Sequence, residues 1–250
     1  MQAQDTVGTG EGGAAPGTNP GALDERRLVR VQALSGAVFA LFLLVHLGNQ
    51  ALAALGPAVY DGAQRALRRG YQAPPLEIFL VIAPLVIHAG AAVLRMVRRR
   101  VRGRRPPANA WARAHRITGL VLLVFFAGHV LATRGASLLY GVYPEFAGIA
   151  FTLRWVPAYF WPYYTGFALA GLYHALYGLG VALPVLGVRL GSGLRRPQVL
   201  APLVLVGGAA LVLGMLGLGG VLFDVGRPEQ HAYPQLLIRL GVVAAPQGPR

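Results

Sequence analysis

Residues 30–46 read RVQALSGAVFALFLLVH, and residues 113–129 read RAHRITGLVLLVFFAGH. Aligned without gaps, both stretches follow the pattern R-x4-S/T-G-x9-H, so they form an internal repeat. Each stretch is followed by a further apolar segment with a histidine near its middle, His88 in the first case and His174 in the second. The chain therefore looks like two copies of a helical hairpin, each copy carrying two histidines.

The composition is that of a membrane protein. Hydrophobic residues make up 55% of the 250 residues and charged residues only 13%. A soluble domain of this size could not bury so many hydrophobic side chains away from its surface. All 23 basic residues are arginines, clustered between the apolar segments, which argues against nucleic-acid binding and for contact with anionic lipid headgroups. Without cysteine, the chain can form neither a disulfide nor a thiolate-bound iron–sulfur cluster.

Five apolar segments approach the roughly 20 residues needed to cross the hydrocarbon core. We expect membrane spans at about residues 30–54, 76–98, 115–134, 158–188 and 199–223. The predicted fold class is an all-α membrane protein with five transmembrane helices: a four-helix bundle from the two hairpins, plus a fifth helix. Residues 1–22 are expected to form a disordered cytoplasmic tail, residues 23–226 the membrane domain and residues 227–250 a C-terminal tail outside.

The distribution of arginines predicts the orientation. The segment from Arg95 to Arg116 contains nine arginines, which marks it as a cytoplasmic loop of a bacterial inner-membrane protein. Five spans then place the N-terminus inside and the C-terminus outside. Arg65, Arg68 and Arg69 oppose this rule, because they fall in the first loop on the outer side.

The histidines of the repeat fall at two depths. His46 and His129 each lie ten residues beyond the Ser-Gly or Thr-Gly step, which is about 15 Å further toward the outer side. His88 and His174 lie nearer the inner side, within about ten residues of the cytoplasmic ends of their spans. This predicts an outer pair, His46 with His129, and an inner pair, His88 with His174.

Such pairs match the ligand set of a low-spin haem, because two axial imidazoles from opposed helices hold the iron and the bundle keeps water away. A single histidine in a span is often only a hydrogen-bonded core residue. Four histidines, one per helix at matched depths, are harder to explain in that way, because an ionisable group in lipid is costly unless it is bound. We therefore expect the four-helix bundle to be a haem-binding bundle that holds two haems of type b.

Further candidates surround the four histidines. Candidates for holding haem propionates at the cytoplasmic mouths are Arg30, Gln32, Ser35, Arg113, His115, Arg116 and Thr118. Membrane topology alone would equally explain the arginines. Glu77 is the only acidic residue within a predicted span. Its position near the outer end favours a solvated interfacial carboxylate, and the alternative is a proton carrier for an outer quinone site.

Residues 76–90, LEIFLVIAPLVIHAG, and residues 115–134, HRITGLVLLVFFAGHVLATR, carry a family resemblance. They resemble the second and third helices of the cytochrome b membrane-anchor subunit of succinate dehydrogenase/fumarate reductase, in its single-chain, five-helix, two-haem form. Span one is similar through Q-x2-S/T-G-x9-H, span four is similar more weakly, and the likeness covers roughly residues 28–223. The resemblance implies that the four histidines are the axial haem ligands, in the pairing given above.

The resemblance also implies partners and a reaction. A flavoprotein subunit and an iron–sulfur subunit would dock on the cytoplasmic face. Electrons would pass between succinate or fumarate and membrane quinone, usually menaquinone in two-haem members. The chain itself would be a non-catalytic electron-transfer and quinone-binding subunit. Leu172 stands where some fumarate reductases of this family carry an acidic residue for proton movement, so that proton route is in doubt here.

Two alternatives remain open. The first is the cytochrome b subunit of another respiratory enzyme, such as a hydrogenase or formate dehydrogenase. Those subunits often place two histidines on one span, whereas His115 is expected at the membrane edge and is not counted as a second ligand of its span. The second is a haem-free anchor or small transporter whose histidines bind protons or a metal ion.

Overall fold

The computed structural model describes residues 20–73, 75–103, 109–189 and 191–244. Within these ranges the chain is helical apart from turns, and five helices are long and apolar enough to cross a membrane. They run Asp24–Leu55, Ile78–Val101, Ala110–Tyr140, Pro157–Val185 and Pro197–Leu218. The all-α class and the five predicted spans are confirmed, and the chain is a multi-pass membrane protein. Residues 1–19 of the expected N-terminal tail lie outside the described residues.

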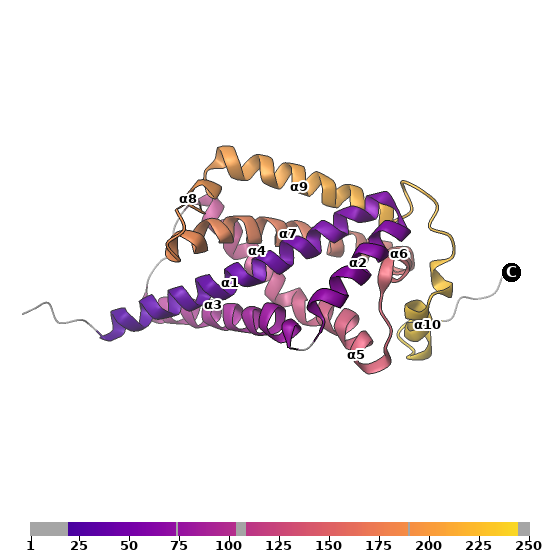
Figure 1. The fold of residues 1–250 in the computed structure, drawn as a ribbon, viewed down its shortest axis with the longest axis horizontal. Helices are drawn as coiled ribbons and strands as arrows, with labels where there is room; N and C mark the ends of the chain where they lie inside the picture. Colours follow the sequence, from indigo (N-terminus) through magenta and orange to yellow (C-terminus); the bar gives the residue numbers. More distant parts are fainter. Residues whose placement is uncertain (1–19, 74, 104–108, 190, 245–250) are drawn as a thin grey trace, which may run out of the picture.

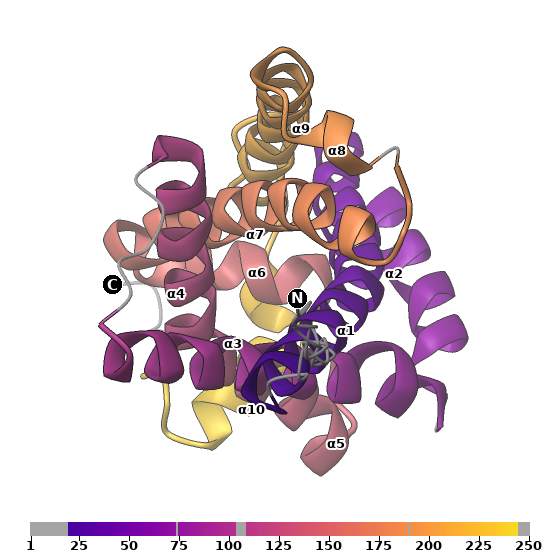
Figure 2. The ribbon, with the colours of Figure 1, turned by 90° about the vertical axis from the view of Figure 1, so that its left-hand side faces the viewer.

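Four helices form the bundle: α1 (Pro20–Leu52), α3 (Ala83–Val101), α4 (Ala110–Val130) and α7 (Pro157–Val185). Helix α1 packs along α3 on one side and along α7 on the other, and α7 in turn packs along α4. In the described part of the chain, α3 and α4 do not pack along one another. Seen end-on, the helices stand at the corners of a square in the order α3, α1, α7, α4 (Figure 2). Helices α1 and α4 are therefore opposite, as are α3 and α7.

The fifth long helix, α9 (Pro197–Leu218), lies outside this square against α7 and the last turns of α1 (Figure 1). Its close approach to α1 depends on Gly214 and Gly217. A side-chain carbon at either position would collide with a backbone carbonyl, that of Gln50 or that of Ala53. Helix α9 thus supports the outer flank of the bundle and contributes none of the paired histidines.

Short helices close one end of the bundle, which we call the capped end (Figure 1). They are α2 (Pro57–Tyr71), α5 (Ala136–Tyr140), α6 (Glu145–Trp155), η4 (Pro228–Gln230) and α10 (Ala232–Arg239). The opposite end, where α1 and α4 begin and α3 ends, is called the arginine end, because it carries Arg30, Arg98, Arg99, Arg100, Arg113 and Arg116. Much of the expected C-terminal tail, residues 227–250, is folded onto the capped end. There Tyr233 is buried, and its hydroxyl donates a hydrogen bond to the Ala132 carbonyl at 3.0 Å.

The charges of the capped end are matched locally. A carboxylate oxygen of Asp61 accepts a hydrogen bond from the Phe146 backbone N–H at 2.8 Å, which satisfies a free amide at the start of α6. Arg65 and Arg68 both reach Glu145, at 3.6 and 3.2 Å. Two of the three arginines that oppose the predicted orientation therefore have an acidic partner at the same end of the molecule.

Two π-helical turns interrupt the second and third spans. They are η2 (Ile78–Ile82) and η3 (Leu131–Gly135), and the remaining short elements are η1 (Ala53–Leu55) and α8 (Gly191–Leu194). The turn η2 ends just before Pro84, which has no N–H with which to continue the α-helical pattern. Glu77 immediately precedes η2, and Arg134 lies inside η3.

Candidate functional site

The structure brings the four histidines of the repeat together in two pairs. The rings of His46 on α1 and His129 on α4 have their centroids 6.1 Å apart and their planes at 75°. The rings of His88 on α3 and His174 on α7 have their centroids 6.2 Å apart and their planes at 85°. In both pairs the helices stand at opposite corners of the square, so each pair reaches across the interior of the bundle.

The spacing within each pair leaves room for a metal ion. Ring nitrogens joined by a hydrogen bond lie about 3 Å apart, which would put the ring centroids about 5 Å apart. A metal ion between two rings contributes two bonds of about 2 Å, which puts the centroids roughly 6 Å apart. The observed 6.1 and 6.2 Å are too long for a direct hydrogen bond and suit a pair that shares a metal ion, and they also fall within the range of ordinary edge-to-face ring packing.

The two pairs occupy two levels of the bundle. Gly36 on α1 and Gly119 on α4 lie directly against the rings of the inner pair, His88 and His174. The outer pair follows these glycines by ten residues on the same helices, about 15 Å along the helix axis. The inner pair is therefore the one nearer the arginine end.

A backbone carbonyl holds each ring of the inner pair. Nδ1 of His88 lies 3.0 Å from the carbonyl oxygen of Gln32, and Nδ1 of His174 lies 3.1 Å from that of His115. A carbonyl oxygen only accepts hydrogen bonds, so Nδ1 must carry the hydrogen and donate it. Nε2 then keeps its lone pair, and in this form a histidine binds a metal.

These hydrogen bonds depend on Gly36 and Gly119. A Cβ atom at Gly36 would overlap the ring of His88, with Cε1 at 2.7 Å, and a Cβ atom at Gly119 would stand 2.7 Å from Cε1 of His174. The glycine of each Ser-Gly or Thr-Gly step thus lets an imidazole reach the backbone of the neighbouring helix. The residues present fit a metal-ligating histidine on both copies of the repeat.

Aromatic rings, rather than carbonyls, surround the outer pair. Phe42 stacks with His46 at a centroid distance of 5.9 Å, and Phe167 lies 5.3 Å from His129. Within the described residues neither outer ring makes a hydrogen bond. The two pairs therefore share a geometry and differ in their immediate surroundings.

Most of the candidates for propionate binding are either exposed at the arginine end or hydrogen-bonded within their own helices. Arg30, Arg113 and Arg116 are exposed at the arginine end. The hydroxyls of Ser35 and Thr118 donate to carbonyls of their own helices at 2.7 and 2.9 Å, so both are engaged by the backbone beside the inner pair. Propionate binding stays a prediction for all of them.

Gln32 belongs to a polar network that ties the end of α3 to the start of α1. Arg95 donates hydrogen bonds to the side chain of Gln32 and, at 3.4 Å, to Glu25. Arg98 pairs with Asp24 at 3.2 Å. From the sequence these arginines indicate only topology, because their acidic partners lie 70 and 74 residues earlier and no local pattern connects them.

His115 lies beside the inner pair. Its ring stacks on that of His174 with centroids 4.0 Å apart and lies 5.1 Å from the ring of Tyr177. Its Nδ1 atom is buried and has no hydrogen-bond partner in the described part of the chain. His115 is in the second turn of α4, which begins at Ala110, and its position at the membrane edge stays a prediction.

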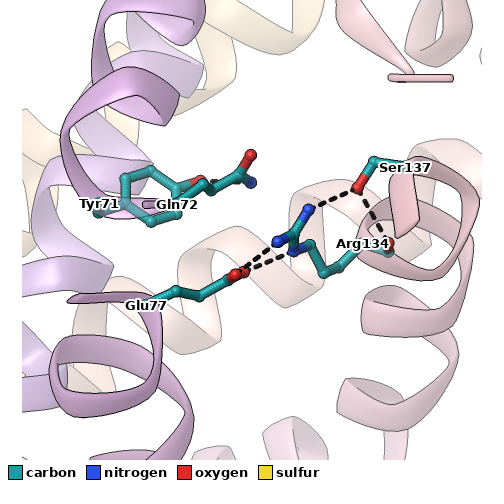
Figure 3. A network of polar contacts seen from close by, with 5 residues as sticks. All are labelled: Tyr71, Gln72, Glu77, Arg134 and Ser137. Atoms are coloured by element: carbon teal, nitrogen blue, oxygen red, sulfur yellow. Dashed lines mark hydrogen bonds and ion pairs between the residues drawn. The ribbon is translucent and has the colours of Figure 1, made fainter. Parts of the chain in front are cut away.

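Glu77 is only 8% exposed and forms an ion pair with Arg134 (Figure 3). Nε and Nη2 of Arg134 donate to the two carboxylate oxygens at 2.6 and 2.5 Å, and Nη1 donates to the Ser137 hydroxyl at 3.0 Å. The expectation of a solvated carboxylate is therefore wrong. Its partner lies 57 residues away, and nothing in the local sequence relates the two positions. A role for Glu77 in proton transfer stays a prediction.

No group of three or more histidine, aspartate, glutamate or cysteine side chains gathers as a metal site among the described residues. Zinc and calcium bound by protein side chains generally take three or more of them. Two imidazoles from opposed helices are instead a donor set that could serve as the axial ligands of a metal whose remaining ligands come from a macrocycle. The donor chemistry of both pairs therefore fits haem iron.

In comparisons with known proteins, no family model, no curated protein and no solved structure matches this chain. The paired histidines and the groups around them therefore carry the functional argument.

Proposed function

We propose that the chain is a two-haem cytochrome b that anchors a succinate:quinone oxidoreductase in the bacterial inner membrane. His46 and His129 would be the axial ligands of one haem b, and His88 and His174 those of the other. The observation that carries this proposal is that four helices contribute one histidine each and that the rings lie in two pairs, with centroids 6.1 and 6.2 Å apart, across opposite corners of the bundle.

The surroundings of the histidines support the same assignment. The carbonyls of Gln32 and His115 hold the Nδ1 hydrogens, so the Nε2 lone pairs of the inner rings are free to ligate. Phe42 and Phe167 cover the outer rings with apolar surface. When bound, haem supplies reversible one-electron oxidation and reduction. The chain's own residues orient the ligands and exclude water.

The arrangement suits electron transfer along the membrane normal. The two levels are about 15 Å apart, which is roughly half of the hydrocarbon core. Electrons would travel between the arginine end and the capped end through the two levels. With the N-terminus in the cytoplasm, the arginine end would face that compartment.

The family resemblance supplies the partners. A flavoprotein subunit and an iron–sulfur subunit would dock at the arginine end, and a membrane quinone, menaquinone in our proposal, would accept or donate the electrons. Arg30 and Arg113 are exposed there and would be attracted to acidic protein surfaces and to anionic lipid headgroups.

The test is to purify the tagged chain from its native membrane and to measure three quantities together. These are the reduced-minus-oxidised absorbance spectrum, the number of haems per chain, and the identity of the co-purifying subunits. We expect two b-type haems per chain, with a flavoprotein, an iron–sulfur protein and succinate:quinone activity. A single haem per chain contradicts the two-haem assignment, and haem with hydrogenase or formate dehydrogenase subunits favours that alternative. A haem-free protein favours the anchor or transporter alternative.

A further inference from the structure

The repeat places the same groups around both rings of the inner pair. Gln32 and His115 occupy equivalent positions of the repeat, and their carbonyls accept hydrogen bonds from the rings at 3.0 and 3.1 Å. Gly36 and Gly119 are also equivalent, and each leaves the space that its imidazole fills. The same arrangement of a glycine and a carbonyl thus occurs twice, once around each ring of the inner pair.

The outer pair has no such glycine and carbonyl arrangement within the described residues. Its rings contact Phe42 and Phe167, and neither ring makes a hydrogen bond among the described residues. The difference matters chemically. A hydrogen bond from Nδ1–H to a carbonyl raises the basicity of the imidazole and fixes its plane, whereas an apolar contact does neither.

We propose that Gly36 and Gly119 are positioning residues that make His88 and His174 the stronger electron-donating ligands. By admitting the two rings to the carbonyls, they stabilise the oxidised iron at the inner level more than the outer ligands do at theirs. Hydrogen bonding to the axial ligands is one of the factors that set the reduction potential of a haem in a protein. This inference rests on the proposed two-haem function.

A second contact predicts a change of the opposite sign. The single hydrogen of the Ser35 hydroxyl is shared between the Val31 carbonyl, at 2.7 Å, and the Gln32 carbonyl, at 3.3 Å. A carbonyl that accepts from an additional donor is a weaker acceptor for the ring. Removing the Ser35 hydroxyl therefore strengthens the bond from Nδ1–H of His88, without placing any atom in the way of the ring. The Thr118 hydroxyl lies 3.5 Å from Nδ1 of His174 itself, so the matching change at Thr118 does not isolate this effect.

The test is a redox titration of both haems, with electron paramagnetic resonance spectra, on the purified complex and its variants. In Gly36→Ala the new Cβ displaces the ring of His88, so we expect the inner haem potential to become more positive while the outer one stays unchanged. The matched control is Gly90→Ala on α3, where a Cβ meets no atom within 4 Å and neither potential is expected to move. The inner haem is identified independently as the one that His88→Ala removes.

Ser35→Ala keeps the proposal testable if Gly36→Ala fails to retain the inner haem. This variant is expected to move the inner potential in the negative direction and to leave the outer one in place. If both haems are present and Ser35→Ala leaves the inner potential unchanged, or moves only the outer one, the positioning role is wrong. Absence of haem from the unmodified protein contradicts instead the proposed function itself.

Discussion

The guanidinium of Arg134 holds the carboxylate of Glu77 with two N–H donors, at 2.6 and 2.5 Å from its two oxygens. The pair joins the second and third spans, whose helices α3 and α4 do not otherwise pack along one another in the described part. Each residue adjoins or belongs to a π-helical turn, a local departure that is frequent where a side chain must be redirected for a specific role. The pair therefore links the second and third spans to one another near the capped end.

Replacing one member of this pair should be far more damaging than replacing both. Arg134→Gln leaves a buried carboxylate without a cation, and we expect it to lower the free energy of unfolding by about 3–5 kcal/mol. The double variant Glu77→Gln with Arg134→Gln should recover most of that loss, because no unpaired charge remains. Thermal unfolding in detergent, followed by helical circular dichroism, measures both, and the exposed Arg99→Gln is the control. A double variant as unstable as the single one contradicts the account.

The two arginines that reach Glu145 should contribute unequally. The side chain of Arg68 is 12% exposed and also lies over the ring of Tyr143 at 4.0 Å, whereas that of Arg65 is 53% exposed. We expect Arg68→Ala to lower stability by about 1 kcal/mol or more, through the lost ion pair and cation–π contact. Arg65→Ala should have a smaller effect in the same assay. Equal losses from the two variants would show that the buried contacts of Arg68 are not what matters.

The capped end should respond to pH through Asp61. Burial raises the pKa of this carboxyl above its ordinary value of 3.8, and the hydrogen bond from the Phe146 N–H partly opposes that rise. A pKa that is higher in the folded state gives a stability contribution that is complete below the unfolded pKa and is lost as the pH rises through the folded one. We therefore expect wild-type stability, relative to Asp61→Asn, to fall between about pH 4 and neutral pH. Unfolding midpoints of both proteins across this range measure the effect, and a constant difference contradicts it.

The paired histidines could be predicted from the sequence because the repeat encodes them directly. A fixed spacing on a helix fixes depth, so the ten residues from each glycine to His46 or His129 were enough to separate two levels. The proximity of the rings within each pair follows from this depth and from antiparallel hairpins. The role of Gly36 and Gly119 was not predicted, because it depends on which neighbouring helix turns a ring toward their backbone.

Other features depend on contacts that no local pattern contains. Arg134 meets Glu77 only because two spans with π-helical turns come together at the capped end. The short helices α2 and α10 are amphipathic and pack on the largely buried α6, so segments of 8–15 residues are stabilised by tertiary contacts and apolar span length does not reveal them. The stacking of His115 on His174 could not be predicted either, because it depends on how α4 and α7 pack together.

The measurement that tests the central claim most directly is the haem spectrum of the four single histidine-to-alanine variants, resolved by redox titration. We predict that His46→Ala and His129→Ala lose one and the same haem, and that His88→Ala and His174→Ala lose the other. If His46→Ala and His88→Ala instead remove the same haem, or if all four variants retain both haems, the paired-ligand account is wrong.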